Sequence, residues 1–122
     1  MSSTQFARIK TISLETYKKN GSPVRSPVWV VEDNGLLYVR SDPDSWKVKR
    51  IRRNSSVRLA PSNMRGIVKG DWVKGEAHFA GEQQRKRILG LFNKKYGIMI
   101  RILNFFNRLT GRRNVTVIAI KV

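Results

Sequence analysis

The sequence predicts a mainly β protein: one small antiparallel barrel with a short helix inserted between its strands and a helical pair packed on it. The first two thirds of the chain alternate short stretches of β-branched and aromatic residues with turns rich in glycine, asparagine and proline. After residue 81 the apolar residues take helical spacing, and the chain ends in a strand pattern. Its 122 residues, 40% of them hydrophobic, are enough for one domain, which we place at residues 1–122.

The first three strands are expected to form a meander. Residues 9–17 alternate loosely and lead into a turn in which Gly21 can adopt a positive φ. Residues 23–33 form the second strand, and an Asp-Asn-Gly turn separates it from the third at 36–41. Pro27 lies inside the second strand although it cannot donate a hydrogen bond to a neighbour. It therefore indicates a sheet edge, a bulge or a stretch of backbone that faces a ligand.

A short helix and three more strands are expected next. The helix covers residues 46–53, with Asp44 or Ser45 as its N-cap and with Val48 and Ile51 turned inward. The strands are expected at residues 57–61, 64–69 and 72–80.

The helical pair is predicted at about residues 82–110, as helices over 82–95 and 98–109 separated at Gly97 and ended by Thr110 and Gly111. The apolar face of the second helix consists of Ile98, Ile102, Phe105 and Leu109. We expect the pair to cover the barrel. Because it is also basic, a membrane-surface helix is an alternative, and further apolar residues, among them Met99 and Phe106, could supply a dimer contact. The final segment, 114–122, is expected to be a buried strand.

The charge balance indicates an anionic partner. The chain has 25 lysines and arginines against 8 acidic residues, a net charge of +17, and so large an excess attracts phosphates. Composition alone leaves nucleic acid, anionic lipid and a phosphorylated cofactor open. No apolar run is long enough to span or insert into a membrane and no signal peptide is evident, so we expect a cytoplasmic protein.

Side-chain chemistry excludes several classes of enzyme. Without cysteine the chain has no disulfide, thiolate metal site or cysteine nucleophile. Its acidic residues are scattered, so no metal site or carboxylate pair is expected, and His78 is expected to be an ordinary strand residue. No catalytic residue can be assigned. An enzyme of this composition takes its chemistry from a cofactor.

An anion site is expected where the third strand meets the short helix. Lys47 falls in the first helical turn, where free N–H groups and the helix dipole attract an anion. Ser41 and Ser45 add hydroxyl donors, and Trp46 is a candidate for stacking on a ring. The alternative is that the basic residues of this helix form only a solvated face.

Three stretches, in this order, resemble the pyridoxamine 5′-phosphate oxidase-like (PPOX class) proteins. They are LETYKKNGSPVRSPVWVVEDNGLLYVRS, KVKRIRRNSSVRLAPSNMRG and KKYG, and they extend from Leu14 to Gly97. The resemblance is to the branch of probable deazaflavin-dependent (F420-dependent) enzymes. It implies an FMN-binding-like split β-barrel that forms a homodimer, with two cofactors at the subunit interface.

The resemblance also implies which residues bind the cofactor. The strand from Arg25 to Val30 lays its backbone along the flavin or deazaflavin ring, and Ser41, Ser45 and Lys47 hold the phosphate. The expected cofactor-binding residues are Arg25, Ser26, Pro27, Val28, Trp29, Ser41, Ser45, Trp46 and Lys47.

The sequence departs from the vitamin B6 oxidases in ways that bear on the cofactor. The arginine and lysine that flank their ring-binding strand are Ser26 and Val31 here, and their Ser-Arg-Lys is Ser45-Trp46-Lys47. This argues against pyridoxamine phosphate oxidation and favours F420 over FMN. The leading hypothesis is hydride transfer between F420 and a small organic substrate. The alternatives are an FMN enzyme of the same fold and, less favoured, a non-enzymatic barrel that binds nucleic acid.

Overall fold

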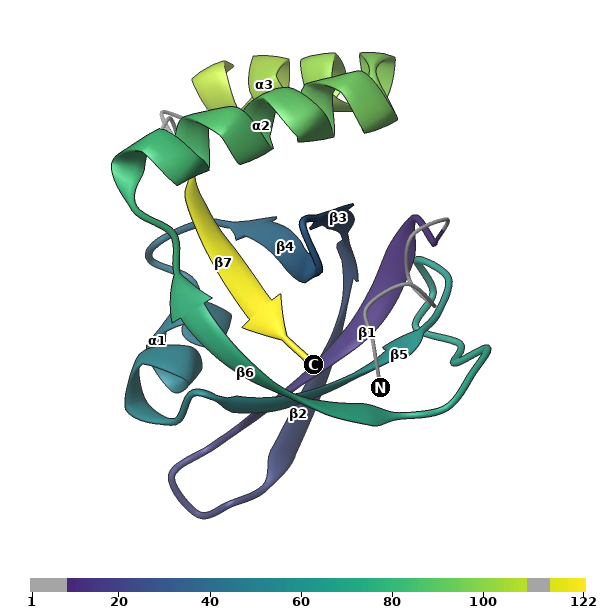
Figure 1. Cartoon of the computed structure of the whole chain (residues 1–122), viewed down its shortest axis with the longest axis vertical. Helices are drawn as coiled ribbons and strands as arrows, with labels where there is room; N and C mark the ends of the chain where they lie inside the picture. The colour runs from purple at the N-terminus through teal and green to yellow at the C-terminus, as the bar shows by residue number, and fades with distance from the viewer. Residues whose placement is uncertain (1–8, 110–114) are drawn as a thin grey trace.

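Seven strands form one antiparallel sheet that curls into a barrel in the computed structural model, which describes residues 9–109 and 115–122 (Figure 1). The elements are β1 Thr11–Tyr17, β2 Pro23–Trp29, β3 Val31–Asp33, β4 Leu36–Ser41, α1 Trp46–Arg53, β5 Ser56–Pro61, β6 Val73–Phe79, α2 Glu82–Tyr96, α3 Ile98–Leu109 and β7 Thr116–Lys121. The order in the sheet is β2-β1-β5-β6-β7-β4-β3. This architecture confirms the predicted fold class.

The predicted second strand, 23–33, is divided at Val30 into β2 and β3, which form the two ends of the curled sheet. β2 pairs with β1, from Thr11 opposite Trp29 to Tyr17 opposite Pro23. β3 pairs with β4 instead. The two ends of the sheet are thus joined through a single residue. Among the described strands β2 pairs with β1 alone, so Pro27 lies on a sheet edge, where the backbone is also open to a ligand.

The prediction of a strand at residues 64–69 is wrong, because this segment is a turn. The Oδ1 atom of Asn63 accepts hydrogen bonds from the backbone N–H groups of Arg65 and Ile67, at 2.9 and 3.1 Å. Gly66 supplies the positive φ, +84°, that the turn requires. The asparagine side chain takes backbone donors that a strand would give to its neighbour.

The core lies inside the barrel and continues beneath the helices. Val48 and Ile51 of α1 are buried among the inward-facing strand residues, as predicted. A second cluster forms where Phe92 and Tyr96 of α2 pack on the strands. β7 is buried from Val117 to Ile120 between β6 and β4, which confirms the expected central strand.

The helical pair covers the barrel through α2, while α3 lies beside α2 and differs from the prediction. Ile98, Ile102 and Phe105 were expected to form its inward face, yet they are 70%, 52% and 59% exposed. Ile100 is buried instead, in the cluster that contains Phe92 and Tyr96. Because α2 already occupies the end of the barrel, α3 has α2 to pack on. The side chains of Phe106 and Leu109, and the expected helix end at Thr110 and Gly111, lie outside the described residues.

Candidate functional site

The end of β4 and the start of α1 bring two of the predicted site residues together. Ser41 is the last residue of β4, and its Oγ lies 3.2 Å from the Oγ of Ser45. Ser45 is the N-cap of α1, and its Oγ accepts a hydrogen bond from the backbone N–H of Val48 at 3.3 Å. The helix therefore begins at the predicted residue. Its first-turn N–H groups and the two hydroxyls point to a place for an anion.

Lys47, in the first turn of α1, is a half-buried cation. Among the residues that the structure describes, no carboxylate or carbonyl is bonded to its ammonium group. Burial, and then the positive charge of Arg50, lower the pKa of Lys47 below its ordinary value. An anion beside the ammonium group would offset both effects. This position is therefore suited to a phosphate.

A strongly basic cavity of about 580 Å³ lies between the β1–β2 turn and α1. Its lining consists of five cations and one indole: Lys18, Lys19, Lys49, Arg50, Arg53 and Trp46. The Trp46 ring is 72% exposed, with the Nζ of Lys49 4.5 Å from its centroid. The cavity thus combines an accessible aromatic face with a positive field, a combination that binds anionic ligands carrying rings.

The five predicted residues of β2 do not all face the same surroundings. Val28 is buried in the core, whereas Ser26 and Pro27 are half-buried on the edge strand. Trp29 stacks on Tyr96 with ring centroids 5.0 Å apart. The Arg25 side chain is occupied by an ion pair, so it is the backbone of this strand that can meet a ring. β2 also contacts β4, which leads into α1.

The ion pair of Arg25 belongs to a cluster around Glu15 that the sequence analysis missed. The Glu15 side chain is 1% exposed and is bonded by Arg25 Nε at 2.8 Å and Arg58 Nε at 2.7 Å. The hydroxyl of Tyr17 donates to it at 2.7 Å. The bond from Arg58 is the largest cause that lowers the pKa of Glu15, to about 2, against the opposing effect of burial. Both arginines also lie over the Trp72 ring. Cross-strand register is the signal for this cluster, because Glu15 lies opposite both Arg25 and Arg58.

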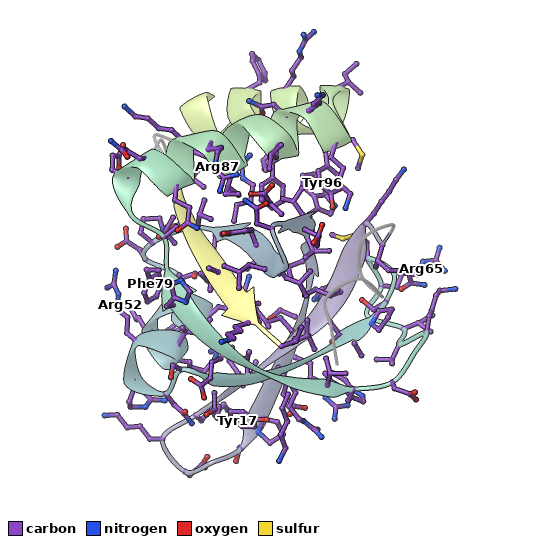
Figure 2. All side chains as sticks on the ribbon, viewed as in Figure 1. Tyr17, Arg52, Arg65, Phe79, Arg87 and Tyr96 are labelled. Carbon is purple, nitrogen blue, oxygen red and sulfur yellow. The ribbon has the colours of Figure 1, made fainter. Side chains whose placement is uncertain are left out.

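Tyr96, labelled in Figure 2, and its neighbour Lys95 lie at the end of α2 and clamp the break between β2 and β3. The Tyr96 hydroxyl accepts from the N–H of Val30 at 3.1 Å and lies 2.7 Å from the Val30 carbonyl and 2.6 Å from that of Lys10. The Nζ of Lys95 donates to the carbonyls of Val30 and Ile9, each at 2.8 Å. Burial raises the pKa of Tyr96 to about 12, so the hydroxyl keeps its proton. The KKYG stretch therefore positions the edge strand.

We expect Tyr96→Phe to lower the free energy of unfolding by about 1–2 kcal/mol, because it leaves buried backbone groups at the break without one partner. The amide of Val30 should also exchange its hydrogen faster. Urea unfolding and hydrogen exchange measure the two effects. Tyr38→Phe is the control, because the Tyr38 hydroxyl is bonded only by the Gln84 side chain among the described residues. Equal stability of the two variants would contradict the clamp.

Among residues 9–109 and 115–122 no group of three or more histidine or acidic side chains could hold a metal ion. His78 is an exposed residue of β6, as expected. No helix in the described part of the chain is long and apolar enough to cross a bilayer.

Comparison with known proteins places the fold. No model of a protein family matches the sequence, and no curated protein matches it significantly. Solved structures match over nearly the whole chain. The haem storage protein HutZ from Vibrio cholerae is 12% identical, with a TM-score of 0.73, over 97% of this chain and 85% of that one. A pyridoxamine 5′-phosphate oxidase-type protein from Listeria innocua is 18% identical, with a TM-score of 0.64, over 91% and 82%. An F420-H2-dependent reductase is 17% identical, with a TM-score of 0.63, over 92% and 94%. The chain therefore has the split β-barrel fold of the pyridoxamine 5′-phosphate oxidase-like proteins, which include F420-dependent reductases.

Proposed function

We propose that this protein is a cytoplasmic oxidoreductase that binds F420 at the interface of a homodimer and transfers hydride to a small organic substrate. The observation that carries the proposal is the start of α1, where the Ser41 and Ser45 hydroxyls meet and the half-buried cation Lys47 occupies the first helical turn. The fold agrees with it, since F420-dependent reductases share this barrel. The dimer follows from the family resemblance.

The residues at the start of α1 fit a phosphate group. Lys47 would neutralise its charge, while Ser41 and Ser45 would donate hydrogen bonds from their hydroxyls. The backbone N–H groups in the first turn of α1 point out of the start of the helix and would add further donors to the same anion. Ser41 ends β4, Ser45 is the N-cap of α1 and Lys47 lies in its first turn, so the groups that would hold the phosphate belong to adjoining segments.

The edge strand β2 fits a flat ring. One side of its backbone has no neighbour among the described strands, and the clamp from α2 fixes its end at Val30. Bound F420 would supply hydride chemistry, which no side chain in the described part of the protein can supply. The chain itself would bind and orient the ring through β2 and anchor the phosphate through Lys47.

F420 is favoured over FMN by the number of cations at the phosphate site. The oxidases' Ser-Arg-Lys is Ser45-Trp46-Lys47 here, so one cation remains next to the N-cap. The other cations lie in the neighbouring basic cavity, where they suit a ligand whose negative charge extends beyond one phosphate. FMN in the same site is the closest alternative.

A different class of function, binding of single-stranded nucleic acid, is favoured by one observation. The exposed Trp46 ring lies among cations, an arrangement that stacks bases and attracts their phosphates. It explains neither the half-buried Lys47 nor the clamped edge strand. We therefore rank it below the cofactor.

An equilibrium titration of the purified protein with F420 and with FMN, followed by ring fluorescence, tests the proposal. We expect F420 to bind more tightly than FMN, with one cofactor per chain. Tighter binding of FMN would support the proposed site but show that its cofactor is FMN. Binding of neither, together with binding of a single-stranded oligonucleotide that weakens steeply with salt, would overturn the proposal. Sedimentation equilibrium measures the dimer in the same samples.

A further inference from the structure

α3 presents apolar side chains to the surroundings. Ile98, Met99 and Ile102 are 70%, 49% and 52% exposed, whereas Ile100 on the opposite side of the helix is 1% exposed. Ile98 and Ile102 are one helical turn apart, so they share one face of α3. Scattered exposed apolar residues need no explanation, but adjacent ones on one helix face indicate a contact surface.

This surface lies at one end of the molecule. α2 and α3 run side by side across the end of the barrel opposite the β1–β2 turn (Figure 1). The basic cavity beside α1 is lined from that turn, so it is remote from α3. A partner on α3 would therefore leave the proposed phosphate end of the cofactor site, at the start of α1, uncovered.

The helical pair is basic, and two acidic residues that lie at it, Glu82 and Asp33, are paired with Arg85 and Arg87. Residues 83–115 contain no aspartate or glutamate. Arg101, three residues after Ile98, borders the apolar face and is exposed, as are Lys86 and Lys94 on the neighbouring helix α2. A partner that covers this surface must therefore offer apolar contact in its centre and negative charge around it.

We propose that α3 binds the surface of a bilayer that contains anionic lipids. An amphipathic helix with cations beside its apolar face lies in the plane of a membrane, with apolar side chains among the lipids and cations at the headgroups. With 12 residues, α3 is too short to span a bilayer, so the contact is peripheral. A second copy of the chain fits less well. The cations around one α3 would face those around the other and repel them.

Vesicle flotation tests the proposal with matched variants. The vesicles contain phosphatidylglycerol and phosphatidylcholine, or phosphatidylcholine alone. Ile98→Gln/Ile102→Gln removes apolar contact from α3 and leaves the net charge unchanged. Met64→Gln/Ile67→Gln is the control, since these side chains are 54% and 56% exposed in the turn after β5. We expect the α3 variant to bind the anionic vesicles about tenfold more weakly than the wild type and the control. Circular dichroism checks that both variants are folded.

A fluorescent label whose emission depends on the polarity around it distinguishes insertion of α3 into the vesicle surface from general attraction of a basic protein to anionic lipids. Because the chain has no cysteine, Ile102→Cys and Ile67→Cys each accept a single fluorescent label. We expect anionic vesicles to shift the emission at position 102 to the blue and to leave position 67 unchanged. Equal binding of both glutamine variants, or equal shifts at both labels, would overturn the proposal. So would conversion of a dimer to a monomer by the α3 substitutions without any loss of vesicle binding, because α3 would then join two copies.

Discussion

We expect Glu15→Gln to lower the free energy of unfolding by about 2 kcal/mol at pH 7. The substitution keeps the shape of a buried side chain but leaves Arg25 and Arg58 facing each other without their carboxylate. The shift of the Glu15 pKa from 4.5 to about 2 corresponds to about 3 kcal/mol, and screening of the two partly exposed arginines by water reduces it. Urea unfolding followed by circular dichroism measures the loss. Asp71→Asn is the control, because Asp71 is an exposed carboxylate.

The same cluster predicts how stability depends on pH. The pKa of Glu15 is lower in the folded chain than in the unfolded chain, so its contribution is complete above about pH 4.5. The contribution is lost as the pH falls from there towards 2, where the folded state also takes up the proton. The stability difference between the wild type and Glu15→Gln should therefore shrink across this range. A difference that stays constant down to pH 2 would contradict the assignment.

The second large effect that we expect is a loss of cofactor affinity, at the proposed phosphate site. Lys47→Ala should weaken binding of the cofactor by about 1–3 kcal/mol, which is roughly 5- to 150-fold in Kd. The physical reason is the loss of a charge-assisted bond to an anion in partly desolvated surroundings. Equilibrium titration followed by ring fluorescence measures the change, using the cofactor that the wild type binds more tightly.

The control for Lys47 is Lys69→Ala, which makes the same change in net charge at an exposed residue. It should leave the affinity almost unchanged. An equal loss in both variants would mean that only the overall positive field attracts the cofactor. Unchanged affinity in Lys47→Ala would remove this residue from the site.

Local chemistry made much of the fold predictable. Ser45 before a helical apolar pattern located the start of α1, and Gly97 separated the two C-terminal helices. The sequence could not show the break at Val30, because it depends on bonds from Tyr96, which lies 66 residues away. The segment 64–69 contains the β-branched residues Ile67 and Val68, which favour a strand. It is a turn because backbone N–H groups donate to the side chain of Asn63 instead.

The candidate site was predictable in part, for a similar reason. Ser41 and Ser45 are close in the sequence, so a strand end followed by a helix start was enough to bring their hydroxyls together, with Lys47 in the helical turn that follows. The Glu15 cluster joins three strands, and only their register shows that it exists. The sequence did not show that the apolar face of α3 points outward. The spacing of apolar residues shows which of them share a helix face, but not whether that face points to the core or to the surroundings. It is the tertiary packing of α2 on the barrel that leaves this face of α3 exposed.

The proline in β2 has a consequence for how the protein behaves at high concentration. A strand with a free side is a template to which strands of other molecules can add, which is how many β proteins begin to aggregate. Pro27 interrupts the row of N–H donors along such a strand, so a strand of another molecule finds fewer hydrogen bonds to form there. The edge thus stays open to a small flat molecule while it resists extension by another chain.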